Sequence, residues 1–473
     1  MPRPSDARSY FDSIAGRPDH RPVQRAFHRQ LTRWFTDRVE PGKRVLEIGC
    51  RHGDLLRAVQ PSQGKGLETS ERLYEATCFR HAARPELEFV LHPYEDKPLP
   101  EAYDYILLNY IAGYLTDIQR TLGLLQQSAH PRTRLLITTL NHVWLGPLRF
   151  AQRIGLVNPQ PPSNWLSVSD LIGLLELSGW EVIETGTVQL CPFHVPLISS
   201  LLNRFLVKLP GFRAFGMTQT VVARPKLPVA LPRQMRCSVI VPARNEAGNI
   251  RAALDRIPVL GAGTEVIFVE GNSKDDTWET IQREVASYSG PHLVKALKQP
   301  GRGKWDAVRT GFEAATGEVL VIQDADLTAP PEDLPKFFEV ITTGAAEFAN
   351  GSRLVYPMDQ NAMRLLNFFG NKFFALALTY VLGQPVKDSL CGTKMLLRSD
   401  YERLKVRIRE LGDFDPFGDF NLLFGAALLR LRIRDVPVRY KDRTYGETNI
   451  SRFSHGWLLL KMTAFGLFHV RWR

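Results

Sequence analysis

The chain has 473 residues, enough for two or three domains of ordinary size, and its composition of 44% hydrophobic and 23% charged residues is that of a globular protein. Lysine and arginine outnumber aspartate and glutamate by 60 to 49, and the formal net charge of +11 favours anionic partners, such as phosphorylated substrates or an anionic membrane surface. No basic stretch resembles a nucleic-acid recognition motif, so we expect no nucleic-acid partner.

The cysteines and the apolar segments indicate in which cellular compartment the protein is expected. The N-terminus has no apolar core of signal-peptide length. The longest apolar segments, residues 366–382 and 457–470, are shorter than the roughly 18 residues that a membrane-spanning helix needs. The cysteines are odd in number and lack metal-ligand spacing, which favours reduced thiols: Cys50, Cys78, Cys191, Cys237 and Cys391. We therefore expect a cytoplasmic protein without a transmembrane helix.

The first strong pattern lies at residues 44–56, RVLEIGCRHGDLL, where an apolar strand runs into a glycine-punctuated turn and then a helix. Gly49 and Gly53 can take backbone conformations that let the chain approach a ligand closely, and the helix that follows offers free amide groups. Glu68 follows Glu47 by about 20 positions, which is where a dinucleotide-binding fold places its ribose-binding acid. The sequence therefore predicts a nucleoside-containing ligand here.

This pattern resembles the class I methyltransferases that bind S-adenosylmethionine, whose first motif runs acid-x-Gly-x-Gly-x-Gly and whose second strand ends in an acid. The resemblance covers about Arg44 to Pro225. Further matches are strands at 102–109 and 134–140, and a segment at 163–184 that resembles the family's final helix and strand. The resemblance implies S-adenosylmethionine as cofactor, bound by Glu47, Gly49, Gly53 and Glu68.

One position departs from the methyltransferase motif. The family's middle glycine is Arg51, and the acid often found near the adenine falls at His92 or Pro93, which leaves Glu95 and Asp96 as nearby substitutes. The Arg51 side chain either blocks the cofactor or points outward, so the alternative is a Rossmann-like domain that has lost its cofactor. The absence of an obvious catalytic base is uninformative, because methyl transfer from a sulfonium often needs only proximity and orientation.

A segment rich in proline and basic residues, 226–236, separates two series of alternating strand and helix patterns. Proline makes such a segment a semi-stiff linker rather than part of a sheet. We expect an α/β protein with two doubly wound domains, at residues 1–225 and 237–452, and a C-terminal helix at 453–473. We expect the first of these domains to be Rossmann-like.

In the second half, segment 237–250 is expected to hold a strand that ends in Pro-Ala-Arg-Asn-Glu. Segment 265–277 is expected to hold a second strand that ends in Glu270 and a polar turn. Glu270 can accept hydrogen bonds from a base or ribose, and Asp275 can cap the helix that starts nearby. Residues 299–312, QPGRGKWDAVRTGF, form a glycine-rich basic loop that enters a helix. Gly301 and Gly303, together with Arg302, Lys304 and the helix amino terminus, form a candidate diphosphate site.

The next strand, within GEVLVIQDADLTAPPEDL (317–334), delivers Asp324 and Asp326 at its carboxyl end. Ligand crevices lie beyond the carboxyl ends of parallel strands. Two oxygen donors one residue apart suit Mg²⁺ or Mn²⁺, which keep several waters and bridge to substrate phosphates. The pattern predicts a metal site at these two residues and a nucleotide-diphosphate donor.

The order of these elements resembles the family 2 glycosyltransferases of the GT-A fold, most closely those of the dolichol-phosphate mannose synthase type. The resemblance covers Cys237 to about Arg452, including segments 350–355, 387–401, 413–423 and 436–453. It implies that Asp324 and Asp326 hold the metal and that Arg353 and Arg443 neutralise phosphate charge. The nucleotide-sugar-binding residues are then Ala243, Asn245, Glu246, Glu270, Asp275, Gly303, Lys304, Asp324 and Ala325.

Three departures from the family pattern bear on the donor. Glu270 and Gly271 replace the usual pair of aspartates, and Thr328 stands where relatives often carry glutamine beside the metal. Thr448 and Asn449 replace serine and lysine. Each change alters a polar contact with donor or acceptor, so donors of the GDP-mannose and UDP-glucose types both stay open.

The acceptor decides which further residues are catalytic. A polyprenyl phosphate, with a second pKa of about 6, is largely ionised at neutral pH and needs no general base. A glycan hydroxyl needs a carboxylate to take its proton, and Asp388 or Asp419 is then the candidate base. The alternative role for Asp419 is to cap a helix or to pair with Arg430 or Arg432.

The C-terminal segment 453–473 combines Trp457, Phe465, Phe468 and Trp472 with Lys461, Arg471 and Arg473. This composition suits an interfacial helix on anionic lipid, with a terminal helix packed on the catalytic domain as the alternative. Relatives of this type often add transmembrane helices here. We expect peripheral attachment at the inner face of the plasma membrane.

Together these patterns predict a metal-dependent inverting glycosyltransferase that moves a hexose to a polyprenyl phosphate or related glycan acceptor, fused to a methyltransferase-like domain, in surface glycan or glycolipid synthesis. One alternative is an S-adenosylmethionine-dependent methyltransferase whose second half only binds glycan. Another is a membrane-docked scaffold, which the intact Asp324, Asp326 and loop 301–304 argue against.

Overall fold

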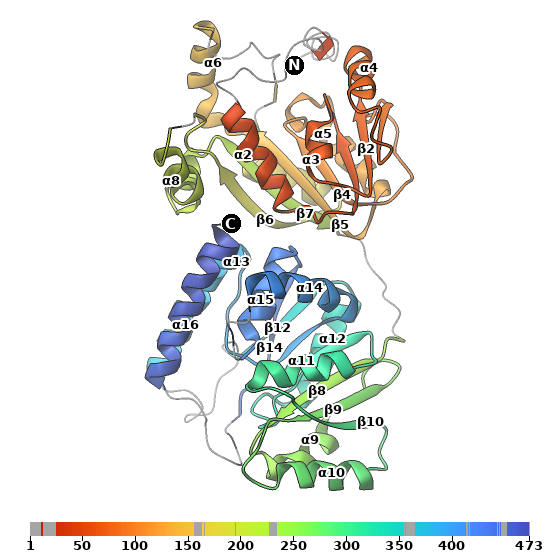
Figure 1. Ribbon diagram of the computed structural model, residues 1–473, viewed down its shortest axis with the longest axis vertical. Coiled ribbons are helices and arrows are strands. Elements are labelled where there is room, and N and C mark those ends of the chain that lie inside the picture. The colour runs from red at the N-terminus through yellow and green to blue at the C-terminus, as the bar shows by residue number, and fades with distance from the viewer. Residues whose placement is uncertain are drawn as a thin grey trace. The chain divides into compact units, whose positions relative to one another are not determined.

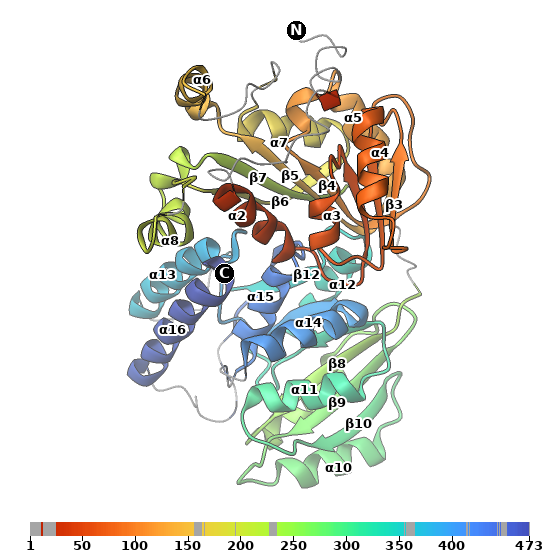
Figure 2. The ribbon, with the colours of Figure 1, turned by 45° about the horizontal axis from the view of Figure 1, so that its top comes forward.

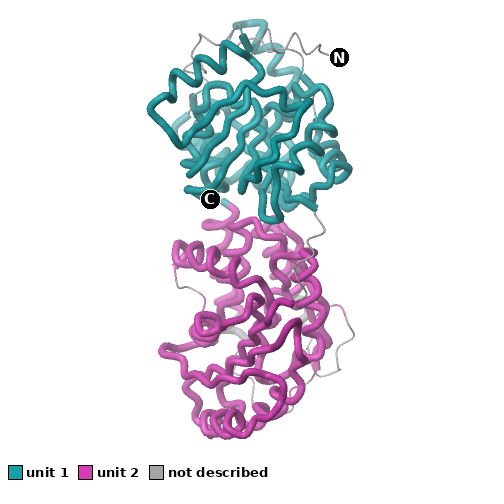
Figure 3. The backbone as a smooth tube through the Cα atoms, turned by 90° about the vertical axis from the view of Figure 1, so that its right-hand side faces the viewer, with its two compact units in different colours: residues 1–227, 472–473 teal, residues 228–471 magenta. Residues whose placement is uncertain are grey.

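The chain forms two compact units, residues 1–227 with 472–473 and residues 228–471 (Figure 3). The structure is a computed structural model. It describes residues 11–12, 25–155, 163–164, 166–193, 195–226, 234–353, 355, 365–412, 415, 417–441, 443, 445 and 452–472. Most of the expected linker and the Thr448–Asn449 departure lie outside these residues.

Unit 1 is built on a seven-stranded sheet of order β3-β2-β1-β4-β5-β7-β6 (Figure 1). Strand β7 runs antiparallel to both of its neighbours, β5 and β6. The strands are β1 (Arg44–Ile48), β2 (Gln63–Glu68), β3 (Leu87–Leu91), β4 (Tyr103–Asn109), β5 (Ala129–Leu140), β6 (Trp180–Val188) and β7 (Thr218–Pro225). Parallel strands bring their carboxyl ends to one edge, where the candidate cofactor residues stand.

Helices cover both faces of this sheet because successive strand residues face opposite sides. Leu46 and Ile48 of β1 belong to one core cluster, and Val45 belongs to the other. Helices α5 and α7 pack on the first cluster, and α2 and α3 on the second. The helices are α2 (Arg25–Thr36), α3 (Asp54–Ala58), α4 (Glu71–Arg80), α5 (Ile118–Leu125), α6 (Leu145–Arg153), α7 (Val168–Leu177) and α8 (Ile198–Arg204).

Unit 2 has a second seven-stranded sheet, of order β10-β9-β8-β11-β13-β12-β14. Strands β10, β9, β8 and β11 are parallel, and β13 is antiparallel to β11 and β12. The strands are β8 (Cys237–Ala243), β9 (Thr264–Glu270), β10 (Leu293–Lys298), β11 (Val319–Ile322), β12 (Phe348–Ser352), β13 (Lys394–Leu397) and β14 (Ile433–Pro437). The four parallel strands end at the same edge.

The helices of unit 2 again form two layers. Helices α11, α14 and α15 pack on one core cluster and α9, α10 and α12 on the other, with Ile240 and Val239 of β8 facing opposite ways. The helices are α9 (Ile250–Arg256), α10 (Thr277–Ser287), α11 (Lys304–Ala314), α12 (Leu334–Thr342), α13 (Leu365–Leu382), α14 (Arg398–Leu411), α15 (Asp419–Leu428) and α16 (Arg452–Gly466).

Helices α13 and α16 lie side by side and close one end of the first cluster (Figures 1 and 2). Phe374 and Leu378 of α13 and Leu459 and Met462 of α16 are buried there. The expected C-terminal helix is thus packed on the unit on one side, while Trp457 on α16 is exposed. None of the helices in the described ranges has the length and apolar character to cross a bilayer.

The expected α/β class with two mixed domains is confirmed. One element was wrong: the segment at 163–184 contains α7 and part of β6 but is not the last of its domain, because β7 follows and inserts between β5 and β6. Strand β7 is buried throughout, and its pairing joins residues far apart in sequence.

Candidate functional site

The expected nucleotide residues of unit 2 meet at the carboxyl edge of the parallel strands. Strand β8 ends at Ala243, its neighbour β9 ends at Glu270, and β11 on the other side of β8 leads into Asp324. Ala243 is paired in register with Glu270. The strands are buried and the residues after them are polar, so the sheet holds these side chains at one rim.

Two loops at this rim are tied to each other. The Asn245 N–H donates to Ser273 Oγ over 3.0 Å, and Asn245 Oδ1 accepts from the Lys274 N–H over 2.8 Å. Glu270 accepts from the Ser273 N–H, and Asp275 accepts from the N–H and hydroxyl of Thr277, the first residue of α10. Glu270 and Asp275 therefore shape the rim by accepting hydrogen bonds from their own loop.

The glycine-rich loop leads directly into α11. Gly303 has φ +87°, a conformation that favours glycine, and the next residue, Lys304, begins the helix. The Gly301 N–H donates to Asp306 in the first turn over 2.6 Å, which fixes the loop on the helix. Lys304 is thereby aimed along the rim, and its Nζ lies 2.5 Å from Asp324 Oδ1.

The two carboxylates expected to bind a metal are each paired with a cationic side chain of the protein. Asp324 pairs with Lys304, and Asp326 Oδ2 accepts from Arg443 Nη2 over 2.8 Å. Arg443 also lies 3.2 Å from Glu246 Oε1. Thr328, at the position of the family's glutamine, donates its N–H and hydroxyl to Asp326 Oδ1. Three carboxylates thus face two cations across the rim.

These pairings set the charge of the site. Burial alone would raise the pKa of Asp324, but the charge and hydrogen bond of Lys304 outweigh burial and hold that pKa below its usual range. Burial, together with the charges of Asp326 and Asp324, raises the pKa of Glu246 although Arg443 opposes the shift. Asp324 is therefore held as a carboxylate by a protein cation.

The carboxylates fit a divalent ion only as part of a larger shell. In the described part of the chain, no three histidine, cysteine or acidic side chains come together as a ready metal site. Mg²⁺ usually takes one or two carboxylates and completes its shell with water and substrate phosphates. Asp324 and Asp326 supply that number of oxygens, and the phosphates would come from the donor.

Behind the rim lies a second pair of charges, Asp388 and Arg353. Asp388 is fully buried, and its two oxygens accept from Arg353 Nε over 2.8 Å and Nη2 over 2.9 Å. It also accepts from the backbone N–H groups of Arg353 and Leu390. Burial would raise the pKa of Asp388, but the Arg353 guanidinium holds it below its usual range.

Asp419 begins α15 and has a different partner from those expected. Its Oδ1 lies 3.0 Å from the Nζ of Lys394, a fully buried lysine on β13. Lys394 also donates to the Cys391 carbonyl and to Asn350 Oδ1. The alternative role given for Asp419, a helix cap or a pairing with Arg430 or Arg432, is wrong, since the N-cap is Gly418 and the pairing is with Lys394.

The corresponding rim of unit 1 is built differently. Glu47 is buried in β1, and its Oε2 has no hydrogen-bond partner among the residues that the structure describes. Glu68, at the end of β2, accepts from the backbone N–H groups of Arg51, Thr69 and Ser70. Burial raises the pKa of Glu47 well above its usual range, against a backbone hydrogen bond from Leu56 and the charge of Arg51.

The two glycines of the first turn have the expected backbone form, with φ +66° at Gly49 and φ +70° at Gly53. What lies against them is protein. A Cβ at Gly49 would come within 2.7 Å of Ile111, and one at Gly53 within 2.7 Å of Phe89. Their conformation shapes the turn, and their lack of a side chain admits these neighbours.

Arg51 takes φ +50° at the position of the middle glycine, and its guanidinium lies over the Phe11 ring at 5.4 Å. Phe11 in turn packs edge-on against Tyr114. Of the substitutes for the adenine-side acid, Glu95 accepts from the Thr116 N–H. The Arg51 side chain is thus held by an aromatic ring.

Unit 1 fits a cofactor that donates hydrogen bonds. The buried Glu47 Oε2, which has no partner among the described residues, could accept a hydrogen bond from a ligand. The Glu68 carboxylate has about four lone-pair sites, and three of them accept backbone hydrogen bonds. S-adenosylmethionine carries ribose hydroxyls and an ammonium group that could donate to them. When bound, it would supply a methyl group on a sulfonium.

Comparison with protein families matches both halves. Residues 238–405 match the model of glycosyl transferase family 2, and residues 20–185 match the model of a methyltransferase domain. The chain carries a family 2 glycosyltransferase domain. A methyltransferase domain precedes it.

Curated relatives match the glycosyltransferase domain. A dolichol-phosphate mannosyltransferase of Pyrococcus furiosus is 39% identical over 26% of this chain and 34% of its own length. A hexosyltransferase of low-salt glycan biosynthesis in Haloferax volcanii is 28% identical over 46% and 51%. An undecaprenyl-phosphate 4-deoxy-4-formamido-L-arabinose transferase of Klebsiella pneumoniae is 31% identical over 46% and 64%. The chain spans between a third and two thirds of these relatives.

Among solved structures, the methyltransferase domain is similar to the N-methyltransferase NodS of Bradyrhizobium japonicum in complex with S-adenosyl-l-homocysteine. The TM-score is 0.33 and the identity 14%, over 47% of this chain and 100% of that one.

Lys394 of the glycosyltransferase domain is not among the site residues that we predicted from the sequence. The signal for it was a single lysine at the head of the apolar strand KMLL. Such a residue is almost never fully buried unless it is paired. A buried strand lysine therefore marks a charge partner elsewhere in the fold.

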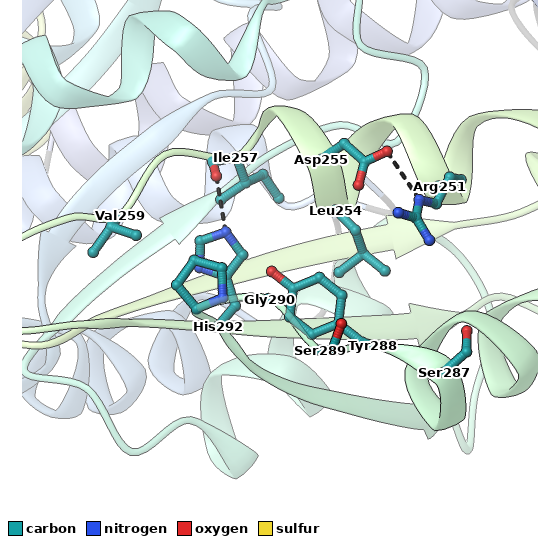
Figure 4. Close-up of a pocket in the computed structure, with 11 residues that line it drawn as sticks. Arg251, Leu254, Asp255, Ile257, Val259, Ser287, Tyr288, Ser289, Gly290 and His292 are labelled. Carbon is teal, nitrogen blue, oxygen red and sulfur yellow. Dashed lines mark hydrogen bonds and ion pairs between the residues drawn. The ribbon is translucent and has the colours of Figure 1, made fainter.

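The glycosyltransferase domain also has a pocket of about 300 Å³ at the opposite edge of the sheet (Figure 4). It lies between the loops that precede β9 and β10, where His292 contacts the Ile257 carbonyl and stacks on Tyr288. Because it faces the amino ends of the strands, it takes no part in the rim described above.

Proposed function

We propose that residues 237–452 transfer a hexose, with inversion, from a nucleotide sugar to a polyprenyl phosphate. The observation that carries this proposal is that both candidate bases, Asp388 and Asp419, are already paired with a cationic side chain. Asp388 is buried with Arg353 on both oxygens, and Asp419 is paired with the buried Lys394. A hydroxyl acceptor needs a carboxylate that can take up a proton, and neither side chain is suited to that.

A phosphate acceptor removes the need for a base. With a second pKa of about 6, its oxygen is already anionic at neutral pH. That oxygen attacks the sugar C1, a new O–C1 bond forms, and the bond between C1 and the nucleoside diphosphate breaks. The diphosphate leaves with the bonding electrons, and no proton has to move.

The residues at the rim then have distinct roles. Asn245, Glu270 and Asp275 shape the two loops that would hold the nucleoside, and the Gly303–Lys304 turn would meet the diphosphate. Asp324 and Asp326 would hold a divalent ion, which when bound would stabilise the charge that develops on the leaving group. Arg443, beside Asp326, would add positive charge there.

The names of the relatives support this acceptor class. Two of the three curated relatives are named for transfer to, or use of, dolichol phosphate or undecaprenyl phosphate. The donor of this chain stays open between the GDP-mannose and UDP-glucose types, because Glu270 and Thr328 depart from the family pattern.

A lipid acceptor requires access to a membrane, and we propose that α13 and α16 provide a peripheral docking surface at the inner face of the plasma membrane. Their sequences contain no acidic residue. Apolar residues exposed on them and the turn after them are Phe373, Leu376, Trp457, Leu460 and Phe468. Lys461 lies over the Trp457 ring at 5.6 Å, a pairing suited to the interface of an anionic bilayer.

The docking proposal is tested by sedimentation with vesicles. Trp457→Ser should lower binding to phosphatidylglycerol vesicles about tenfold, because an exposed aromatic anchor is lost. Phe79→Ser removes an even more exposed aromatic residue, at 88% against 61% for Trp457, from α4 in the methyltransferase domain and should leave binding unchanged. Equal losses in the two variants would contradict the docking surface.

For unit 1 we propose that it binds S-adenosylmethionine and transfers its methyl group, with Glu47 and Glu68 as acceptors of hydrogen bonds from the cofactor. The observation that favours this is that Glu47 Oε2 has no hydrogen-bond partner within the described part of the chain. The pairing of the two domains in one chain suggests a pathway to a methylated surface glycan or glycolipid. The alternative, in which the second half only binds glycan, predicts cofactor binding without turnover of nucleotide sugar.

The test of the glycosyltransferase proposal is a donor panel. The full chain would be incubated with Mn²⁺, polyprenyl phosphate and each of GDP-mannose, UDP-glucose and UDP-N-acetylglucosamine, and release of nucleoside diphosphate followed with and without the lipid. Lipid-dependent release from one donor is the expected result. Release that requires a glycan hydroxyl, or none from any donor, would contradict it.

A further inference from the structure

We propose that Lys304 is an exchangeable counter-ion. It neutralises Asp324 in the free domain and passes to the diphosphate of the donor when a divalent cation takes its place on that carboxylate. This inference rests on the proposed function of the rim, because it assumes that the rim binds a nucleoside diphosphate with a metal ion. It goes further in assigning an order and a coupling to the two ligands.

The first support is the geometry of the pair. Lys304 Nζ lies 2.5 Å from Asp324 Oδ1, and both side chains are partly exposed, at 25% and 29%. A Mg²⁺ ion binds carboxylate oxygens at about 2.0 to 2.1 Å. An ion on that oxygen would stand almost where the ammonium stands, and two cations cannot share the position without strong repulsion.

The second support is that other positions for the ammonium are closed or already filled. Gly392 backs the pair so closely that a Cβ there would collide with Asp324 Oδ2 and come within 2.5 Å of Lys304 Nζ. The next carboxylate, Asp419, is near enough to raise the pKa of Lys304, but it already holds Lys394. Asp326, the third carboxylate near Lys304, already holds Arg443, and the Gly303 turn, where a diphosphate would lie, directly precedes Lys304.

The third support is the contrast with Arg443. Arg443 bridges Asp326 and Glu246, so one cation serves two carboxylates on that side. Lys304 serves Asp324 and lies at the start of α11, where a phosphate is favoured by the helix amino terminus. Lys304 therefore has both a ligand to release and an anion site beside it.

The exchange predicts that metal and nucleotide bind together. In the free domain a divalent ion must displace the Lys304 ammonium, so it should bind weakly alone. With a nucleoside diphosphate present, the displaced ammonium gains a phosphate partner and binding of both ligands improves. Because coupling is reciprocal, the metal must raise nucleotide affinity by the same factor.

The experiment measures binding, not turnover. Binding of Mn²⁺ alone is followed by electron paramagnetic resonance on the full chain, and binding of GDP and UDP by calorimetry with and without Mn²⁺. Lys304→Met should bind Mn²⁺ alone roughly tenfold more tightly than the wild type, because the competing cation is gone. In the presence of Mn²⁺ it should bind its nucleotide roughly tenfold more weakly.

Control variants separate this role from general effects of charge or folding. Lys304→Arg keeps the charge and should resemble the wild type in binding Mn²⁺ alone, and Lys304→Gln should repeat the effect of Lys304→Met. Lys405→Met removes a lysine of α14 that pairs with Glu402 on the same helix and with Glu313 in the last turn of α11, and it should change neither affinity. Melting curves would establish that each variant is folded.

Two results would overturn the exchange. Neutral variants at Lys304 that bind Mn²⁺ alone no more tightly than the wild type would show that Lys304 does not compete with the ion. A wild type that binds nucleotide equally well in EDTA would show that Lys304 and Arg443 replace the metal permanently. If the wild type binds neither nucleotide in Mn²⁺, the proposed function of the rim fails, and this inference with it.

Discussion

The two domains present acidic residues at the same place in similar sheets, yet treat them in opposite ways. In the methyltransferase domain, Glu47 is buried with one oxygen lacking a partner in the described part of the structure, and burial raises its pKa. In the glycosyltransferase domain, Asp324 carries Lys304, whose charge lowers the pKa of Asp324. The rim of the methyltransferase domain offers hydrogen-bond acceptors, whereas the rim of the glycosyltransferase domain contains paired opposite charges.

This difference fits the ligands proposed for the two domains. A nucleoside with an amino-acid chain offers hydroxyl and ammonium donors, and buried acceptors can hold it. A nucleotide sugar with a metal ion brings opposite charges into one site, and existing ion pairs can be exchanged for new ones. Both sheets carry acidic residues at the carboxyl ends of their strands. The two rims therefore differ in the groups that surround each carboxylate, not in the presence of the carboxylates.

The largest effect should come from removing a carboxylate of the charged rim. Asp326→Ala should lower the rate of sugar transfer by about a thousandfold, because it removes a proposed metal ligand and releases Arg443. Asp255→Ala, in an exposed pair with Arg251, is the matched control and should retain full activity. Transfer that survives in Asp326→Ala would remove the metal role from this residue.

Next in size is the loss of the buried pair behind the rim. Asp388→Ala should lower the free energy of unfolding of the glycosyltransferase domain by about 3 kcal/mol, because it leaves the Arg353 charge buried and uncompensated. Asp255→Ala should change it by less than about 0.5 kcal/mol. Both are measured by urea unfolding. Lost transfer at unchanged stability would instead indicate that Asp388 acts as a base.

Glu47 should make the stability of the methyltransferase domain depend on pH. Its pKa in the folded state is raised above the unfolded value of about 4.3, so its stabilising contribution is complete below that value and is lost as pH rises through the folded pKa. Glu47→Gln should flatten this decline between pH 5 and pH 8 by about 1 to 2 kcal/mol, the usual cost of burying an unpaired polar group.

The control for Glu47 is Glu75→Gln, which changes an exposed acid on α4 and should keep the wild-type pH profile in urea unfolding at pH 5 and pH 8. A Glu47→Gln profile parallel to that of the wild type would show that Glu47 is not buried in the charged state at high pH.

The smallest effect should follow from restoring the motif at Arg51. Arg51→Gly removes the strain of φ +50°, roughly 1 kcal/mol, and loses a contact with Phe11 of similar size, so stability should hardly change. Because the side chain is held on Phe11, affinity for S-adenosylmethionine measured by calorimetry should change less than about threefold, or about 0.7 kcal/mol. A gain of tenfold or more would mean that Arg51 blocks the cofactor.

The sequence predicts the strand ends of both domains well, because a buried strand followed by polar residues is a local pattern. Asp324, Glu270 and Glu47 are all found at the carboxyl rims expected for them. The cationic partners of these carboxylates are not predicted by such local patterns. Arg443 and Asp326 are 117 positions apart, and local spacing contains no trace of such a pair.

Two further misses share that cause. Lys394 sits in an apolar strand, where a lysine is explained only by partners that the fold brings to it, Asp419 and Asn350. Strand β7 is separated from β6 by α8 and two short 3-10 helices, and its place between β5 and β6 depends on pairing over long separations. The ion pairs of Asp388 and Asp419 are likewise formed by the fold and are not predicted by local spacing.

The most direct measurement compares two acceptors of the same chain length, polyprenyl phosphate and the free polyprenol, with one radiolabelled donor across pH 5 to 9. We predict that label enters only the phosphate, at a rate that rises with the ionisation of that phosphate near a pKa of about 6 and is flat above it. Comparable transfer to the polyprenol hydroxyl would contradict the central claim, because it would require a carboxylate base that the ion pairs at Asp388 and Asp419 leave no room for.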